Sequence, residues 1–91
     1  MKESIIKEKS YAFALQIIGL ARWVRERKEY EFASQVLRAG TGIGANVEEA
    51  LAGVSRADFI AKMAVASKEA RETHYWLRLL RDSKSLFEKD H

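Results

Sequence analysis

The sequence predicts an all-α protein: an antiparallel up-and-down helical bundle of three long helices and a short or truncated fourth. The 91-residue chain contains no proline, the residue that breaks helix interiors and marks turns. Apolar residues recur at helical spacing in three long segments, and only short connections separate these segments. The length fits one domain over residues 1–91.

The first helix is expected over about residues 5–28. One row of apolar residues follows a single helix face: Phe13, Ile17, Leu20 and Val24. A second row lies beside it: Tyr11, Leu15, Ile18 and Ala21. A helix that covers only a small core needs a narrower apolar stripe. We therefore expect this helix to bury one face inside the bundle and another elsewhere.

A charged run ends this first helix and includes Arg25 and Lys28. Cations near a helix C-terminus complement the helix dipole. The run is therefore either a solvated helix end or a patch that binds nucleic acid, and exposed charge runs are commonly solvated.

The second helix is expected over about residues 30–52, with a glycine-rich middle. Each glycine inside a helix costs about 1 kcal/mol relative to alanine. Either the helix breaks there, or the small residues Gly40, Gly44 and Ala45 let a neighbouring helix approach closely. We expect the continuous helix. A nucleotide-binding loop is disfavoured, because no Gly-Lys-Ser/Thr ending follows and no strand precedes the glycines.

The boundary before the third helix is marked by Gly53, Ser55 and Asp58. Gly53 suits the left-handed position that ends a helix. Ser55 is expected to cap a third helix over about residues 55–82, with Asp58 in its first turn. Residues 83–91 are long enough only for a stub of a fourth helix.

Catalysis and metal binding are disfavoured by the residues present. The chain has no cysteine, and His74 stands at the wrong spacing for a Glu-x-x-His metal pair. No nucleophile-elbow motif surrounds a serine. We therefore expect a protein that is not an enzyme and that takes neither a metal nor a cofactor.

Two groups of polar residues have candidate roles. Asn46, Glu48 and Glu49 are expected to form a structural network, with a glutamate paired to a cation such as Arg71 or Lys68, and Asn46 bonded across helices. On the third helix, three residues share a face suited to stacking bases and contacting phosphates: Arg71, Tyr75 and Arg78. The alternative is that Tyr75 and Trp76 pack in a subunit interface while the arginines stay solvated.

Residues 38–50 (RAGTGIGANVEEA), 55–63 (SRADFIAKM), 68–73 (KEARET) and 75–80 (YWLRLL) carry a family resemblance. They resemble the second and third helices of the bacterial four-helix-bundle family named for proteins encoded in intervening sequences of 23S ribosomal RNA. The similarity covers about residues 10–85, although relatives commonly have serine where Ala39 and Gly42 stand and continue through a full fourth helix.

This resemblance implies a bundle that assembles into a ring, typically a homopentamer, and it brings no catalytic residues. The chain is also similar to the accessory variability proteins of diversity-generating retroelements, which are basic pentameric rings that bind reverse transcriptase and nucleic acid.

The sequence as a whole predicts a non-enzymatic, self-assembling protein of the cytoplasm that binds RNA or DNA through basic residues. The alternative is a protein–protein adaptor or scaffold without nucleic-acid binding, and the net charge of +3 does not decide between them. Self-association is expected because the apolar faces exceed what so short a chain buries, and disulfides are excluded. No secretory signal and no membrane span are visible.

Overall fold

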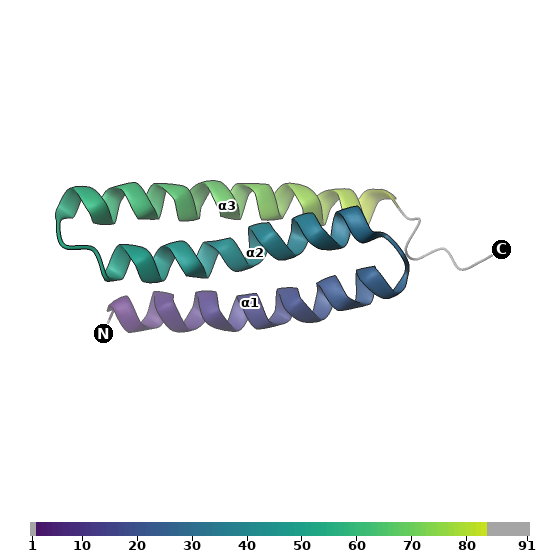
Figure 1. Cartoon of the computed structure of the whole chain (residues 1–91), viewed down its shortest axis with the longest axis horizontal. Helices are drawn as coiled ribbons and strands as arrows, with labels where there is room; N and C mark the ends of the chain where they lie inside the picture. Colours follow the sequence, from purple (N-terminus) through teal and green to yellow (C-terminus); the bar gives the residue numbers. More distant parts are fainter. Residues whose placement is uncertain (1, 84–91) are drawn as a thin grey trace.

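The computed structural model describes the backbone of residues 2–83 and the side chains of residues 5–83. It contains three helices: α1 (Lys2–Glu26), α2 (Tyr30–Leu51) and α3 (Arg56–Ser83) (Figure 1). These residues include no strand, which confirms the all-α class. The predicted fourth-helix stub lies outside the described residues, apart from Ser83, which ends α3.

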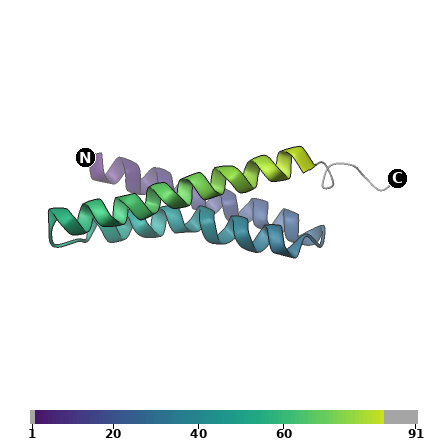
Figure 2. The same ribbon diagram turned by 90° about the horizontal axis from the view of Figure 1, so that it is seen from above.

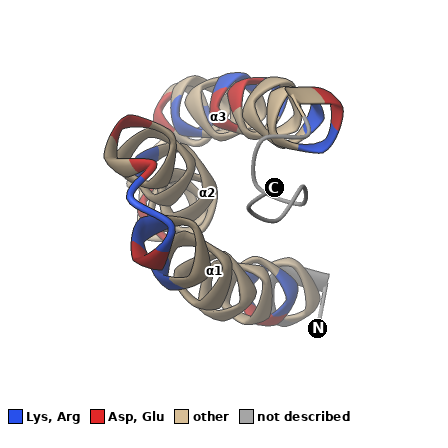
Figure 3. Ribbon diagram, turned by 90° about the vertical axis from the view of Figure 1, so that its right-hand side faces the viewer, with Lys and Arg blue, Asp and Glu red and all other residues tan. Residues whose placement is uncertain are grey.

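The chain runs up, down and up again along one direction (Figures 1 and 2). α2 packs against both other helices, whereas no Cα atoms of α1 and α3 come within 8 Å of each other in this part of the chain. Seen end-on, the helices form an open arc with α2 in the middle (Figure 3). The described residues therefore form a curved layer of three helices, and a closed four-helix bundle is not seen.

α2 runs without a break through its glycine-rich segment, and two of its glycines lie against α1. A Cβ atom added to Gly40 would lie 2.7 Å from two side-chain carbons of Ile17, and one added to Gly44 would lie 3.3 Å from the carbonyl oxygen of Ser10. Close packing of α1 thus accounts for glycine inside this helix. Ala45 takes no part in the contact. Ala45 follows Gly44, and one residue turns about 100° round the helix, so its side chain points away from α1 and is exposed.

The hydrophobic core cluster lies at the end of the molecule that holds the α1–α2 connection. The buried members are Ile17, Val24, Ala33, Val36 and Leu80, and the partly buried side chains around them are Phe13, Leu20, Trp23, Phe32, Trp76 and Leu77. The first apolar row of α1 supplies this core. Two residues of its second row, Tyr11 and Leu15, are exposed.

The connections depart from the predicted boundaries at two residues. Lys28 has a left-handed φ of 66°, and α1 ends at Glu26, two residues earlier than expected. Gly53 is not left-handed, because no glycine in the described residues has a positive φ. A Cβ atom there would lie 3.1 Å from the Asp58 Cβ, so this glycine provides space for the first turn of α3. In that turn, the Asp58 amide donates to Ser55 Oγ at 3.0 Å.

Candidate nucleic-acid interface

Positive charge is concentrated at the end of the molecule that holds the core. We divide the molecule into two ends across its long axis, at the level where Gly40 lies beside Ile17 and Arg38 lies beside Glu69. On one side of it, residues 20–38 and 70–83 contain eight lysines and arginines against five acids, whereas residues 5–19 and 39–69 contain five of each.

The remaining twelve residues, 1–4 and 84–91, contain three basic and three acidic residues. The whole net charge of +3 therefore arises from residues 20–38 and 70–83, which we call the basic end. Figure 3 looks onto this end and shows basic residues at the α1–α2 connection and on α3.

The basic end also holds three pairs of an arginine and an aromatic ring. The guanidinium carbon lies 5.4 Å from the ring centroid in the pair Arg25–Tyr30, 3.6 Å in Arg27–Trp23 and 5.7 Å in Arg78–Tyr75. Each pair joins a cation to a flat apolar surface, and these are the two features that single-stranded nucleic acids contact.

The predicted strip on α3 lies on an exposed side of that helix. Arg71, Tyr75 and Arg78 are all exposed, and their spacing of four and three residues keeps them on one side. Arg71 donates to Ser67 Oγ at 2.9 Å, which leaves its positive charge unpaired by a carboxylate among the described residues. The strip therefore offers two cations beside one exposed ring.

The two predicted residues at the end of α1 belong to a different surface. Arg25 and Lys28 line a shallow depression of about 440 Å³ together with Arg22, Glu26 and Tyr30. Three cations against one carboxylate make this depression suited to a phosphate group. Because α2 separates α1 from α3, the fold does not join the two predicted groups into one patch.

Arg81 contributes less to the basic end than its charge suggests. Its guanidinium donates to both carboxylate oxygens of Asp82, at 2.6 and 2.9 Å. These hydrogen bonds hold the pKa of Asp82 below its usual range and raise the pKa of Arg81. Both side chains are exposed, so this pair is screened by water and adds little to stability.

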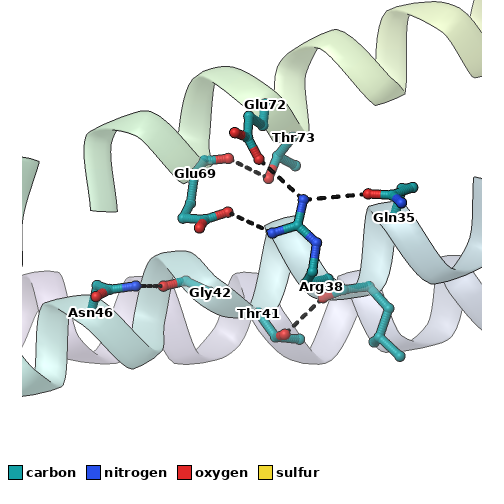
Figure 4. A network of polar contacts seen from close by, with 9 residues as sticks. Gln35, Arg38, Thr41, Gly42, Asn46, Glu69, Glu72 and Thr73 are labelled. Atoms are coloured by element: carbon teal, nitrogen blue, oxygen red, sulfur yellow. Dashed lines mark hydrogen bonds and ion pairs between the residues drawn. The ribbon is translucent and has the colours of Figure 1, made fainter. Parts of the chain in front are cut away.

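A polar cluster between α2 and α3 was missed by the sequence analysis (Figure 4). Arg38 donates to Glu72 at 3.2 Å, and its other terminal nitrogen lies 3.6 Å from Glu69 Oε1. The Glu69 side chain is 12% exposed, and this oxygen has no hydrogen bond within the described residues. Gly42 lies against Glu69, since a Cβ there would be 3.3 Å from the carboxyl carbon. The spacing of Glu69 and Glu72, one turn apart, was the available signal.

The predicted network of Asn46, Glu48 and Glu49 is not formed as expected. Val47 and Ala50 are the buried residues of this turn, so Glu48 and Glu49 lie on the solvent side. Neither pairs with Arg71 or Lys68 in the part of the chain that the structure describes, and that hypothesis is wrong. Asn46 bonds within its own helix, donating from Nδ2 to the Gly42 carbonyl at 2.9 Å.

Neither a metal-binding cluster nor a membrane-spanning helix occurs among the residues that the structure describes. No three histidine, cysteine, aspartate or glutamate residues there come together in a group that would hold a metal ion. None of the helices over this range is both long enough and apolar enough to cross a membrane.

Comparisons with known proteins place the chain in a family. The family model of the 23S rRNA-intervening sequence proteins matches residues 2–91. A solved structure from Bacteroides thetaiotaomicron, described as a protein with unknown function from the S23 ribosomal protein family, is 49% identical with a TM-score of 0.88. The match covers 92% of this chain and 76% of that one. No curated protein matches. The chain belongs to the family of 23S rRNA-intervening sequence proteins.

Proposed function

We propose that this protein is a non-enzymatic, self-associating helical protein that binds RNA or DNA through its basic end. The observation that supports the proposal is that two features lie at the same end of the molecule. The entire net charge of +3 and the three arginine–aromatic pairs occupy the same end of the molecule. Cations attract phosphates and aromatic rings stack on unpaired bases, so this end combines both components of single-strand binding.

Self-association strengthens such binding, because one copy offers only a small surface. Arg78 follows Arg71 by seven positions, so the strip is roughly 10 Å long. Contacts with so few nucleotides are weak when they are made once. Copies held together present several strips to one strand, and the effective concentration of the later contacts then raises the overall affinity.

A titration tests the proposal. Fluorescence anisotropy of a labelled single-stranded RNA, and of the matching DNA, is measured at salt concentrations between about 50 and 200 mM. We expect the affinity to fall as salt rises, and the variant Arg71→Ala/Arg78→Ala to bind more weakly with a shallower salt slope, by about 1.4 if each residue contacts one phosphate.

The matched control is Lys9→Ala/Lys62→Ala, which removes the same charge from exposed positions outside the basic end. It should bind almost as wild type does. Equal losses in the two variants would reduce the effect to net charge alone, and no salt-dependent binding by the wild type would end the nucleic-acid proposal.

A second candidate function is a protein–protein adaptor or scaffold. It is favoured by the large apolar side chains exposed along α1, among them Tyr11 and Leu15. The same titration separates the candidates, because a scaffold assembles and yet shows no salt-dependent affinity for either nucleic acid.

A further inference from the structure

The outer seam between α1 and α2 carries apolar side chains that the fold leaves uncovered. Tyr11 is 60%, Leu15 is 55% and Leu37 is 40% exposed. Ile18 lines a depression of about 410 Å³ in the same seam, and the charged residues around it are Arg22 and Arg25. We call this surface the basic face: Tyr11, Leu15, Ile18, Arg22, Arg25 and Leu37.

The α1 residues of the basic face have the spacing of a helix-packing seam. Positions 11, 15, 18, 22 and 25 alternate in steps of four and three, as the contact positions of packed helices do. The neighbouring seam of α1, which includes Ile17 and Val24, is used for the core. The second seam has the same periodicity but no helix of the described chain covers it.

The opposite flank of α2 carries a surface of the opposite charge. A chain of hydrogen bonds runs along it: Gln35 donates to Glu31 at 3.1 Å, and Arg38 bonds both Gln35 and Glu72. Figure 4 shows Arg38 between Gln35 and the glutamates of α3. We call this surface the acidic face: Glu31, Gln35, Arg38, Glu69 and Glu72. Three carboxylates and one guanidinium give it a formal charge of −2, against +2 on the basic face.

The opposite charges lie at the same height along the molecule. Arg22 and Arg25 share their depression with Ser34 and Leu37 of α2. The residue after Leu37 is Arg38, which holds Glu72 at 3.2 Å. The basic and acidic groups are therefore level with the same two turns of α2, one group in its seam with α1 and the other in its seam with α3.

We propose that the basic face of one copy packs against the acidic face of a second copy, with both copies pointing in the same direction. Side-by-side placement then brings Arg22 and Arg25 opposite the carboxylates, while the apolar seam of α1 is covered. In the assembly these two arginines are engaged by the neighbouring copy, and the strip of Arg71, Tyr75 and Arg78 is the part of the basic end that stays available to nucleic acid. Because the two faces differ, each copy uses both, and the contact repeats as a ring if the rotation closes. This inference rests on the self-association in the proposed function and names the surfaces that produce it.

Each copy takes part in two such contacts, one through its basic face and one through its acidic face, and the size of the basic face is consistent with this. The stretch from Tyr11 to Arg25 is about 21 Å long, and two helices side by side are about 20 Å wide. The resulting area of roughly 400 Å² is typical of interaction patches but small for a stable pair, which buries about 800 Å² on each partner. Ring closure compensates, because every copy is then held on two sides.

The test uses two variants that each disable one face. Leu15→Glu/Arg22→Glu changes only exposed residues of the basic face, and Glu31→Arg/Glu72→Gln alters the acidic face while leaving Arg38 an amide acceptor. Helicity by circular dichroism verifies folding, and sedimentation velocity at micromolar concentration measures assembly. We expect the wild type to assemble and each variant alone to sediment as a monomer.

Mixing the two variants gives the sharpest result. The mixture retains one intact acidic face and one intact basic face on different chains, so one contact can form between them. Because this pair lacks ring closure, it is measured at the highest concentration at which both variants stay soluble, where the mixture should sediment faster than either variant does alone. The matched control is Ile60→Glu, which is also 55% exposed but lies about 120° round α3 from Glu72, and it should assemble as the wild type does.

The other outcomes contradict either the pairing of these two faces or self-association itself. If the wild type assembles but either variant still does, or if the mixture at that high concentration sediments no faster than the variants alone, the pairing of these faces is wrong and self-association stands. If the wild type is itself a monomer, self-association fails together with this inference.

Discussion

Gly40 is the residue at which a single missing atom sets the distance between two helices. Its position in α2 is buried, and a Cβ atom there would lie 2.7 Å from both Cγ1 and Cγ2 of Ile17. Real Cβ contacts essentially never come this close, and Ile17 is β-branched and 3% exposed, so its side chain has little room to turn away. Any side chain at position 40 must therefore push α1 from α2.

We expect Gly40→Ala to lower the free energy of unfolding by about 1–3 kcal/mol, the usual effect of overpacking a core. Urea denaturation followed by circular dichroism measures it. Gly19→Ala is the matched control: Gly19 is an exposed helix position of α1 with no atom within 4 Å of the added Cβ. It should raise stability by about 0.5–1 kcal/mol through helix propensity. Stabilisation by both changes would show that Gly40 is not a close-packing position.

The glycines also show what a sequence reveals about single residues. The glycine-rich run predicted close approach, and the structure places Gly40 and Gly44 against α1. The pattern did not reveal that Gly42 lies against the Glu69 carboxylate on the other side of α2, because that depends on the register of α2 and α3. Gly53 follows the same logic: it was assigned a left-handed backbone, whereas the first turn of α3 requires the space.

At the scale of the helix elements, periodicity predicted the three helices closely, and the ends were less accurate. The spacing of apolar residues depends on the helix repeat alone, so it predicts a helix even when the elements that pack against that helix are unknown. The cluster around Arg38 could not be derived in this way, since it joins residues more than thirty positions apart. The expected partner of Glu48 or Glu49 failed for the same reason, because burial of Val47 and Ala50 turns these glutamates outward.

The turn that ends α1 provides a prediction at this scale. Lys28 has a φ of 66°, a conformation that costs a residue with a Cβ atom roughly 1–2 kcal/mol. Glycine avoids this cost, but its unfolded chain is more flexible by about 0.4–1 kcal/mol. We therefore expect Lys28→Gly to raise the free energy of unfolding by about 0.5–1 kcal/mol.

Thermal and urea denaturation compare this variant with Lys28→Ala, which removes the same charge and keeps the Cβ. The alanine variant should be close to wild type. If both variants change stability equally, the charge of Lys28 is responsible and its backbone conformation is not strained.

At the scale of the whole molecule, the core cluster and the net charge occupy the same end. The core cluster joins α1, α2 and the last turns of α3 there, while the first part of α3 leaves Phe59 and Ile60 exposed. A cation surface placed over a well-packed core is held in a fixed geometry, which favours binding because little ordering is needed when a ligand arrives.

This uneven packing predicts uneven protection of backbone amides, since regions with few buried apolar contacts open at lower free energy. Within α3, residues 73–80 contain the buried Thr73 and Leu80, whereas residues 56–62 are all exposed. We expect hydrogen exchange, followed by mass spectrometry, to be at least tenfold slower in 73–80 than in 56–62.

Both segments belong to one helix, so the comparison controls for helix type, and the variant Leu15→Glu/Arg22→Glu controls for protection that comes from assembly. Equal rates in that variant would mean that α3 opens as one unit. The core at the basic end would then stabilise residues 56–62 of α3 as strongly as residues 73–80.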